Sequence, residues 1–128
     1  MLSCVHKYFH KEISMYYGRR VTLERKNKTD PRPTIINFIY ELSSSDMYPA
    51  IFDQLAELPG FVHKTTCLVE TPDDLTAISQ VVFDTEENLL VYTSNPATVS
   101  LTEYLITLAE DSNIIVSIKD GELVSLHV

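Results

Sequence analysis

The chain has 128 residues, of which 45% are hydrophobic and 22% are charged, and its formal net charge is −8. A chain of this length buries roughly two thirds of its unfolded surface, so one domain can fold without a metal or a disulfide, and the composition excludes a disordered chain. The two cysteines, Cys4 and Cys67, lack the spacing of a zinc site or of a disulfide framework. No apolar run approaches the ~20 residues that span a bilayer, so we expect a cytoplasmic protein.

The first predicted element is a buried central strand at residues 34–42. The run TIINFIYEL is almost continuously apolar and rich in isoleucine and aromatic residues, which is typical of such a strand. Residues 45–58 predict a helix, because Ser45 or Asp46 can cap its start and apolar residues recur at helical spacing. Residues 61–70, FVHKTTCLVE, alternate loosely and are β-branched, which predicts a second strand.

The next segments continue the alternation of helices and strands. Residues 71–83 predict a helix, because Thr71 can cap it and Pro72 suits its first turn. Residues 89–94, LLVYTS, predict a third strand. Residues 100–113 predict a third helix, whose first residues have the spacing of a capping box.

The chain ends in IIVSIKDGELVSLHV, residues 114–128, which predicts a hairpin. Asp120-Gly121 suits a two-residue turn, because both turn positions need a positive φ that these residues tolerate. The predicted order is βαβαβαββ, and we assign an α+β, ferredoxin-like sandwich in which residues 72–83 are an inserted short helix. A doubly wound α/β sheet is the alternative, although the loop SSSD after the first strand lacks the glycines that cradle a phosphate in that fold.

Charge is divided unevenly along the chain. Residues 1–34 hold eight of the ten Lys and Arg against three acids, a net charge of +5, whereas residues 35–128 hold two against fifteen acids, a net charge of −13. We therefore expect a basic N-terminal arm of strand and loop at residues 1–33, which is not an independent domain, followed by a single α+β domain at residues 34–128.

This arm combines cations with tyrosines, so it is the candidate partner-binding surface. Such side chains can neutralise phosphates and stack on unpaired bases. They can equally bind the acidic body of the same chain, a second subunit or another acidic protein, and the sequence does not decide between these partners. The candidate residues are Tyr16, Tyr17, Arg19, Arg20, Arg25, Lys26, Lys28 and Arg32.

The segment from NFIYELSSSD to LLVYTS, residues 37–94, resembles in its layout the small ferredoxin-like subunit of the CRISPR adaptation machinery and its stand-alone relatives. The shared layout is a strand ending in an acid, an amphipathic helix, a second strand, a short helix and a third strand. Members of that family form dimers, and some are metal-dependent nucleases that use an aspartate at the end of the first strand. The resemblance implies a dimer and puts Glu41 in the position of that aspartate.

No motif in the chain is diagnostic of catalysis, so we assign no catalytic residue, no metal site and no cofactor. Glu41 and Asp46 are the candidates for a magnesium-dependent reaction, because Mg²⁺ prefers hard oxygen ligands. The leading hypothesis is a non-enzymatic, dimeric, acidic regulatory protein that binds a macromolecular partner through its charged surfaces, for instance as an inhibitor competing with nucleic acid. The alternatives are a divalent-metal nuclease or phosphodiesterase, and a nucleic-acid binder that acts through the basic arm.

Overall fold

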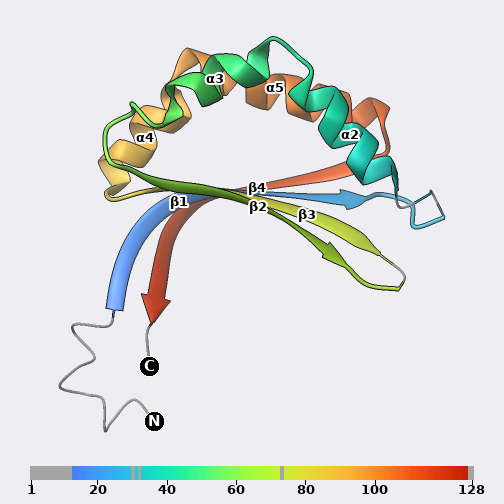
Figure 1. The fold of residues 1–128 in the computed structure, drawn as a ribbon, viewed down its shortest axis with the longest axis horizontal. Coiled ribbons are helices and arrows are strands. Elements are labelled where there is room, and N and C mark those ends of the chain that lie inside the picture. The colour runs from blue at the N-terminus through green and yellow to red at the C-terminus, as the bar shows by residue number, and fades with distance from the viewer. Residues whose placement is uncertain (1–12, 30, 32, 73, 127–128) are drawn as a thin grey trace, which may run out of the picture.

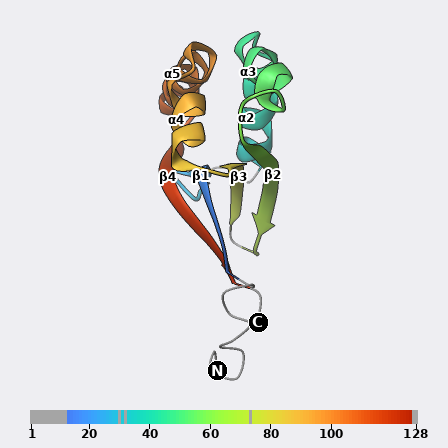
Figure 2. The same cartoon turned by 90° about the vertical axis from the view of Figure 1, so that its left-hand side faces the viewer.

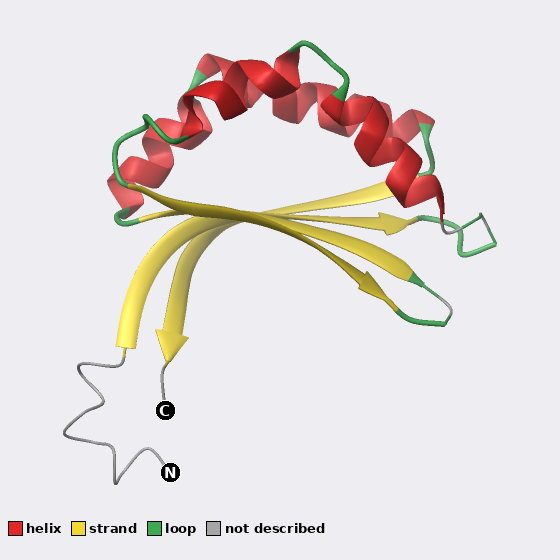
Figure 3. Ribbon diagram, in the orientation of Figure 1, coloured by secondary structure: helices red, strands yellow, loops and turns green. Residues whose placement is uncertain are grey.

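The computed structural model describes residues 13–29, 31, 33–72 and 74–126. Its elements are, in chain order, β1 (Ile13–Arg25), α2 (Pro33–Ser43), α3 (Met47–Leu55), β2 (Phe61–Glu70), β3 (Leu75–Phe83), α4 (Glu86–Ser94), α5 (Pro96–Asp111) and β4 (Ile114–Leu126). The strands form one antiparallel sheet in the order β2-β3-β1-β4, with all the helices on one of its faces (Figures 1 and 3). This is the ferredoxin-like βαββαβ arrangement, in which a pair of helices takes the place of each single helix.

The core lies between the sheet and the helices. α4 and α5 form one group of helices over the sheet, and α2 and α3 form the other (Figure 2). The register places Leu23 of β1 between Ala77 of β3 and Val116 of β4, so these side chains share the face toward the helices. Two groups of buried side chains fill this space, one including Phe38 and the other including Phe83. None of the described helices has both the length and the apolar character needed to cross a membrane.

The ferredoxin-like class predicted from the sequence is confirmed, and the doubly wound alternative is wrong, because every strand pairing is antiparallel. The helix predicted at residues 45–58 is α3, and the strand predicted at residues 61–70 is β2. The helix predicted at residues 100–113 is α5, which begins earlier, at Pro96. There the side chain of Asn95 caps the helix, and a proline is well tolerated in the first turn.

The strand predicted at residues 34–42 is wrong, because this segment is α2. Ile35 is 0% exposed and Phe38 is 2% exposed, whereas Tyr40 is 66% exposed. A strand buries alternate residues, but here the buried positions are three apart, as on one side of a helix. The isoleucine-rich composition of this run favours a strand, yet its periodicity favours the helix that forms.

The helix predicted at residues 71–83 is wrong, and so is the inserted helix of the predicted fold. The segment instead contributes β3, which pairs with β2 on one side and with β1 on the other. Thr71 and Asp74 exchange backbone hydrogen bonds of 3.0 and 3.3 Å, so Thr71 lies in the connection between β2 and β3 and does not cap a helix. Burial along β3 alternates around Ala77, which is the period of a strand.

The third strand predicted at residues 89–94 is also wrong, because this segment belongs to α4. The Thr85 side chain caps the helix by accepting a hydrogen bond from the backbone N–H three residues further on, at 3.1 Å. Two acidic residues occupy the first turn, where the helix dipole favours them. Leu89 and Tyr92 are buried at helical spacing.

The C-terminal hairpin is wrong as well, because β4 is one continuous strand of 13 residues. It pairs with β1 along its whole length, with Asp120 opposite Arg19 and Gly121 opposite Gly18. Tertiary pairing with a central strand therefore overrides the local turn preference of Asp-Gly.

Candidate functional site

The predicted partner-binding residues in β1 do not form one exposed surface. β1 lies between β3 and β4, so the described part of the basic arm is built into the sheet. Alternation along the strand turns Arg19 toward the helices and Arg20 away from them, and Arg20 is exposed. Tyr17 packs against the core, and Tyr16 is partly buried. Arg32 lies outside the described residues.

Three further predicted cations lie at or just beyond the end of β1. Nη2 of the buried Arg25 lies 3.5 Å from Oδ1 of Asp74, and Nζ of Lys28 lies 2.9 Å from Oδ2 of the same carboxylate. The backbone N–H of Lys26 donates to the carbonyl of Asn113 at 2.8 Å, while its side chain is exposed. Arg25 and Lys28 therefore join β1 to the connection between β2 and β3.

The candidate carboxylates for magnesium lie on the helical layer. Glu41 is exposed on α2, and Asp46 is exposed at the N-cap of α3, where its side chain makes no capping hydrogen bond. Because residues 37–43 are helical, Glu41 does not end a strand, and the layout that resembled the CRISPR adaptation subunit is absent. In the part of the chain that the structure describes, no three His, Cys, Asp or Glu residues gather as metal ligands would.

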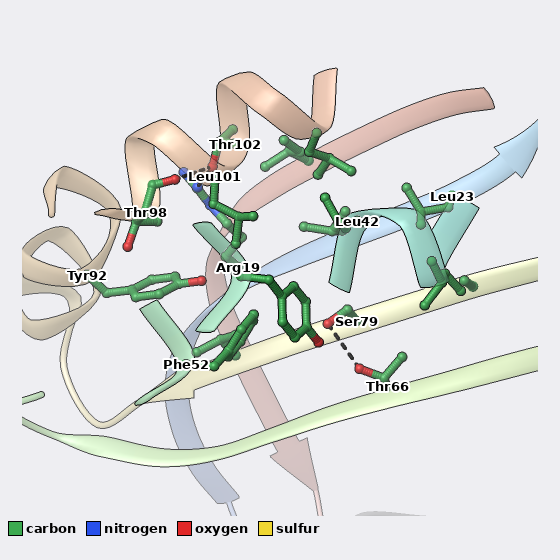
Figure 4. A pocket seen from close by; sticks show the side chains of 17 residues that line it. Arg19, Leu23, Leu42, Phe52, Thr66, Ser79, Tyr92, Thr98, Leu101 and Thr102 are labelled. Carbon is green, nitrogen blue, oxygen red and sulfur yellow. Dashed lines mark hydrogen bonds between the residues drawn. The ribbon is translucent and has the colours of Figure 1, made fainter. Parts of the chain in front are cut away.

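A cavity of about 110 Å³ lies between the sheet and the helices (Figure 4). Every helix and strand contributes to its lining, and most of the lining side chains are aliphatic or aromatic, including Val21, Leu42, Phe52 and Leu101. The lining also includes Thr66, which is exposed on the edge strand β2. The cavity therefore reaches the surface beside β2.

One end of this cavity is polar (Figure 4). Nε and Nη2 of Arg19 donate to the two carboxylate oxygens of Asp120 at 2.7 and 2.9 Å, and Nη1 donates to Oγ1 of Thr102 at 3.3 Å. The Thr102 hydroxyl in turn donates to the carbonyl of Thr98 at 2.8 Å. Tyr92 points its phenol oxygen into the space beside Arg19. Since Asp120 neutralises Arg19, this end is polar but carries no net charge.

The tyrosines of the cavity are neutral hydrogen-bonding groups. Burial raises the pKa of Tyr92, and the nearby charge of Arg19 only partly opposes that effect. Burial also raises the pKa of Tyr48. An ordinary phenol has a pKa of about 10, so both keep their protons at neutral pH. The hydrogen bond to Asp120 raises the pKa of Arg19, which stays charged.

Thr98 contributes a buried threonine to the wall of the cavity. It is 2% exposed, and its Oγ1 makes no hydrogen bond to any other described residue. Leaving a buried hydroxyl unsatisfied costs about 1–3 kcal/mol. Thr98 lines the cavity, but its Oγ1 is itself fully buried and is not open to a molecule held there.

The strands β2 and β3 and the helix α3 form another wall of the cavity. The hydroxyls of Thr66 and Ser79 share a hydrogen bond of 3.3 Å between β2 and β3. Nζ of Lys64 lies 4.5 Å from the ring centroid of Phe52, and burial lowers the pKa of Lys64. This cation–π contact joins β2 to α3, so the position of Phe52 in the wall is supported from the sheet.

The polar end of the cavity is not predicted by the sequence. Thr98, Thr102 and Leu105 recur at helical spacing and share the inner side of α5, but a helix that begins at Ser100 leaves Thr98 out. Asp120 had no local signal of its role, because its partner Arg19 lies 101 residues away.

The sequence matches no known protein-family profile and no curated protein. Solved structures do share its fold. A dimeric ferredoxin-like protein from an uncultured marine organism has a TM-score of 0.56 at 12% identity, covering 90% of this chain and 93% of that one. SnoaB, a cofactor-independent oxygenase from Streptomyces nogalater, has a TM-score of 0.51 at 13% identity, covering 91% and 96%.

A third similar structure is a monooxygenase from the gene ActVA-Orf6 of Streptomyces coelicolor, in complex with the ligand nanaomycin D. Its TM-score is 0.52 at 17% identity, covering 82% of this chain and 86% of that one. At such identities these likenesses establish the ferredoxin-like fold. None of the three proteins is a CRISPR adaptation subunit.

Proposed function

We propose that this protein binds a small, largely apolar ring compound in the cavity between the sheet and the helices. The observation that carries the proposal is a space of about 110 Å³ between the sheet and the helices, lined mostly by apolar side chains. Protein interiors are normally packed to the density of organic crystals, so such a space suits an occupant. An enclosed apolar cavity of about 150 Å³ accepts benzene, so in this smaller space, which opens to the surface, a single ring is the upper limit of what can be enclosed.

One solved protein with this fold supports an organic ligand. The Streptomyces coelicolor monooxygenase is in complex with nanaomycin D, and SnoaB is a cofactor-independent oxygenase. From the complex with nanaomycin D we take only the binding of an organic molecule, and from neither protein do we take a reaction. The lining of this cavity, with its apolar walls and one polar end, is suited to such binding.

Filling the cavity tests the proposal. Ala77 is buried and lines the cavity, so Ala77→Leu puts a larger side chain into the space. We expect the variant to lower the affinity for toluene about tenfold or more, because overpacking a site costs about 1–3 kcal/mol. NMR titration with toluene measures the affinity, and circular dichroism checks that the variant folds. The matched control is Ala56→Leu, at an exposed position outside the lining. Equal toluene affinity in the natural chain and in folded Ala77→Leu would refute the proposal.

A second proposal is that two copies of the chain associate through the face of the sheet opposite the helices. None of the described helices covers that face (Figure 2), and the marine structure of similar fold is a dimer. On this face Ile115 is 42% exposed and Val69 is 47% exposed, so association would bury apolar surface. Multi-angle light scattering measures the mass in solution, and a monomeric mass at every concentration would rule the dimer out.

Binding of another macromolecule through the charged surfaces stays a prediction, and so do the inhibitory role, the absence of a cofactor and the cytoplasmic location. Of the predicted cations that the structure describes, Arg20, Lys26 and Lys28 are exposed and would be the ones to meet nucleic acid or an acidic protein. Titration with single-stranded DNA at low salt tests nucleic-acid binding, since an electrostatic complex is strongest there.

A further inference from the structure

We propose that the ligand is a small apolar carboxylic acid: its ring occupies the cavity, and its carboxylate lies at the mouth beside β2, bound by the ammonium of Lys64 and by the hydroxyl pair of Thr66 and Ser79. This inference rests on the proposed ligand-binding function and adds a chemical class to it. Three features of the mouth carry it: an unused hydroxyl donor, a cation that no described carboxylate pairs with, and a charge environment that favours an anion.

The mouth of the cavity lies on the β2 side of the sheet. Thr66 of β2 is paired with Ser79 of β3, and both residues line the cavity. Thr66 is exposed and Ser79 is partly exposed, so this part of the lining meets the solvent. The two residues lie apart from the polar end that Arg19 and Tyr92 form (Figure 4). A ligand whose ring fills the cavity can therefore keep a polar group at this mouth.

The hydroxyl pair at the mouth leaves one donor for a ligand. Oγ1 of Thr66 and Oγ of Ser79 lie 3.3 Å apart, and either hydroxyl can be the donor of the hydrogen bond between them. Each hydroxyl has one hydrogen, so the hydroxyl that accepts keeps its own hydrogen, and neither makes a hydrogen bond to another described residue. A carboxylate oxygen is the strongest acceptor for such a donor, because the hydrogen bond is then charge-assisted.

Lys64 supplies the positive charge. It lies two residues before Thr66 on the same side of β2, opposite Val81, which lines the cavity. Lys64 is not itself part of the lining, but its Nζ lies 4.5 Å from the ring centroid of Phe52, which is. No described carboxylate forms an ion pair with it. Its flexible four-carbon stem lets the ammonium reach a carboxylate that leaves the cavity beside Thr66.

The surroundings of Lys64 favour an anion. Lys64 is partly buried, and burial alone lowers its pKa, with no contribution from a described acid. A carboxylate beside it would favour the charged ammonium that burial disfavours. At the polar end of the cavity, by contrast, Asp120 already binds two guanidinium nitrogens of Arg19 and would repel an anion. The carboxylate of the ligand therefore fits the mouth and not the polar end.

The test compares phenylacetate with phenylacetamide, two probes of nearly the same shape of which only phenylacetate is charged. Toluene is the probe without a polar group. All three are titrated by NMR against the natural chain, against Lys64→Met, which keeps most of the apolar stem and removes the charge, and against Ser79→Ala. The matched control is Lys119→Met, which removes one positive charge at an exposed position on the uncovered face of β4. Circular dichroism checks that each variant folds.

We expect the natural chain to bind phenylacetate about fivefold more tightly than phenylacetamide, although its net charge is −8. Lys64→Met should lower the affinity for phenylacetate about fivefold and leave phenylacetamide and toluene within about twofold, because only the charge is lost. Ser79→Ala should lower the affinity for phenylacetate and for phenylacetamide about threefold, because both accept a hydrogen bond, and leave toluene unchanged. Lys119→Met should leave all three affinities within about twofold.

Three results would overturn the inference while the ligand-binding function stands, provided that toluene binds the natural chain. The natural chain could bind phenylacetate no better than phenylacetamide, in which case the mouth does not select a carboxylate. Lys64→Met could weaken all three probes equally, which would mean that Lys64 only supports the position of Phe52. Lys119→Met could weaken phenylacetate as much as Lys64→Met does, which would trace the effect to overall charge. If none of the three probes binds the natural chain, the proposed function and this inference fail together.

Discussion

Asp74 shows how single residues hold this fold together. Its carboxylate lies 2.9 Å from Nζ of Lys28 and 3.5 Å from Nη2 of Arg25, and it also accepts the backbone N–H of Leu75 at 2.9 Å. The hydrogen bond from Lys28 is the main cause of the lowered pKa of Asp74. One side chain thus ties the end of β1 to the start of β3.

The Asp74 contacts predict an acid dependence of stability. A carboxyl whose pKa is lowered by folding stabilises the native state above its unfolded pKa of about 3.9 and loses that contribution as the pH falls through the lower folded value. We therefore expect Asp74→Asn to unfold at a lower urea concentration than the natural chain at about pH 6, and the difference to shrink below about pH 4. Urea midpoints measured across this pH range, with the exposed Asp53→Asn as control, test the expectation. A difference that persists unchanged at about pH 3 would mean that the charge of Asp74 is not its cause.

At the scale of elements, the sequence predicts best those segments whose start signal and periodicity agree. α3, β2 and α5 are of this kind: the predicted bounds of β2 agree with the structure, and α3 and α5 differ from the prediction only at their ends. In α2 the isoleucine-rich composition favours a strand, whereas the spacing of the residues that become buried favours a helix. The segment forms the helix. In β3 the Thr71-Pro72 start signal belongs to a turn between strands, which nothing local reveals.

The cavity is less predictable than the fold, because all the elements contribute to it. Arg19 was singled out for its charge, but its role depends on Asp120, which the hairpin prediction placed in a surface turn. The sequence predicts a strand at residues 89–94, which include Tyr92. A site of this kind becomes visible only once the pairing of β1 with β4 is known.

Because β4 is continuous through Gly121, a β-branched residue at this position is expected to stabilise the strand. Among the described glycines, Gly60 has a positive φ, of 73°, and Gly121 does not; a Cβ at Gly121 would meet nothing within 4 Å. We expect Gly121→Thr to raise the free energy of unfolding by about 0.5–1 kcal/mol, since glycine weakens a strand by that amount. Urea denaturation measures the change.

The control for this prediction is Gly60→Ala. Its added Cβ would collide with the side chains of Asp84 and Asn88 at a left-handed φ, so this variant should be less stable than the natural chain. A hairpin turn at Asp120-Gly121 would make Gly121→Thr destabilising too, and that outcome would refute a continuous β4.

At the scale of the whole molecule, charges on the uncovered face of the sheet favour one arrangement of two copies. Arg20, Thr22 and Glu24 follow one another along this face of β1, and Lys119 lies beside Arg20 in the register. Consider a two-fold axis that lies between the two sheets, runs perpendicular to their strands and passes Thr22 of both copies. Such an axis would place Glu24 of each copy over Arg20 and Lys119 of the other. An axis along β1 would instead set like charges over one another, which disfavours that dimer.

A charge exchange therefore tests the proposed dimer and its orientation together. We expect Arg20→Glu and Glu24→Arg each to raise the dimer dissociation constant about tenfold, because like charges then face one another. The double variant restores opposite charges across the axis and should recover most of the lost affinity, which a dimer built on another surface would not do. Sedimentation equilibrium measures the dissociation constants, with Glu57→Arg on the helical side as control, at an exposed position. Equal weakening by the control, or a double variant weaker than both single variants, would place the interface elsewhere on the molecule.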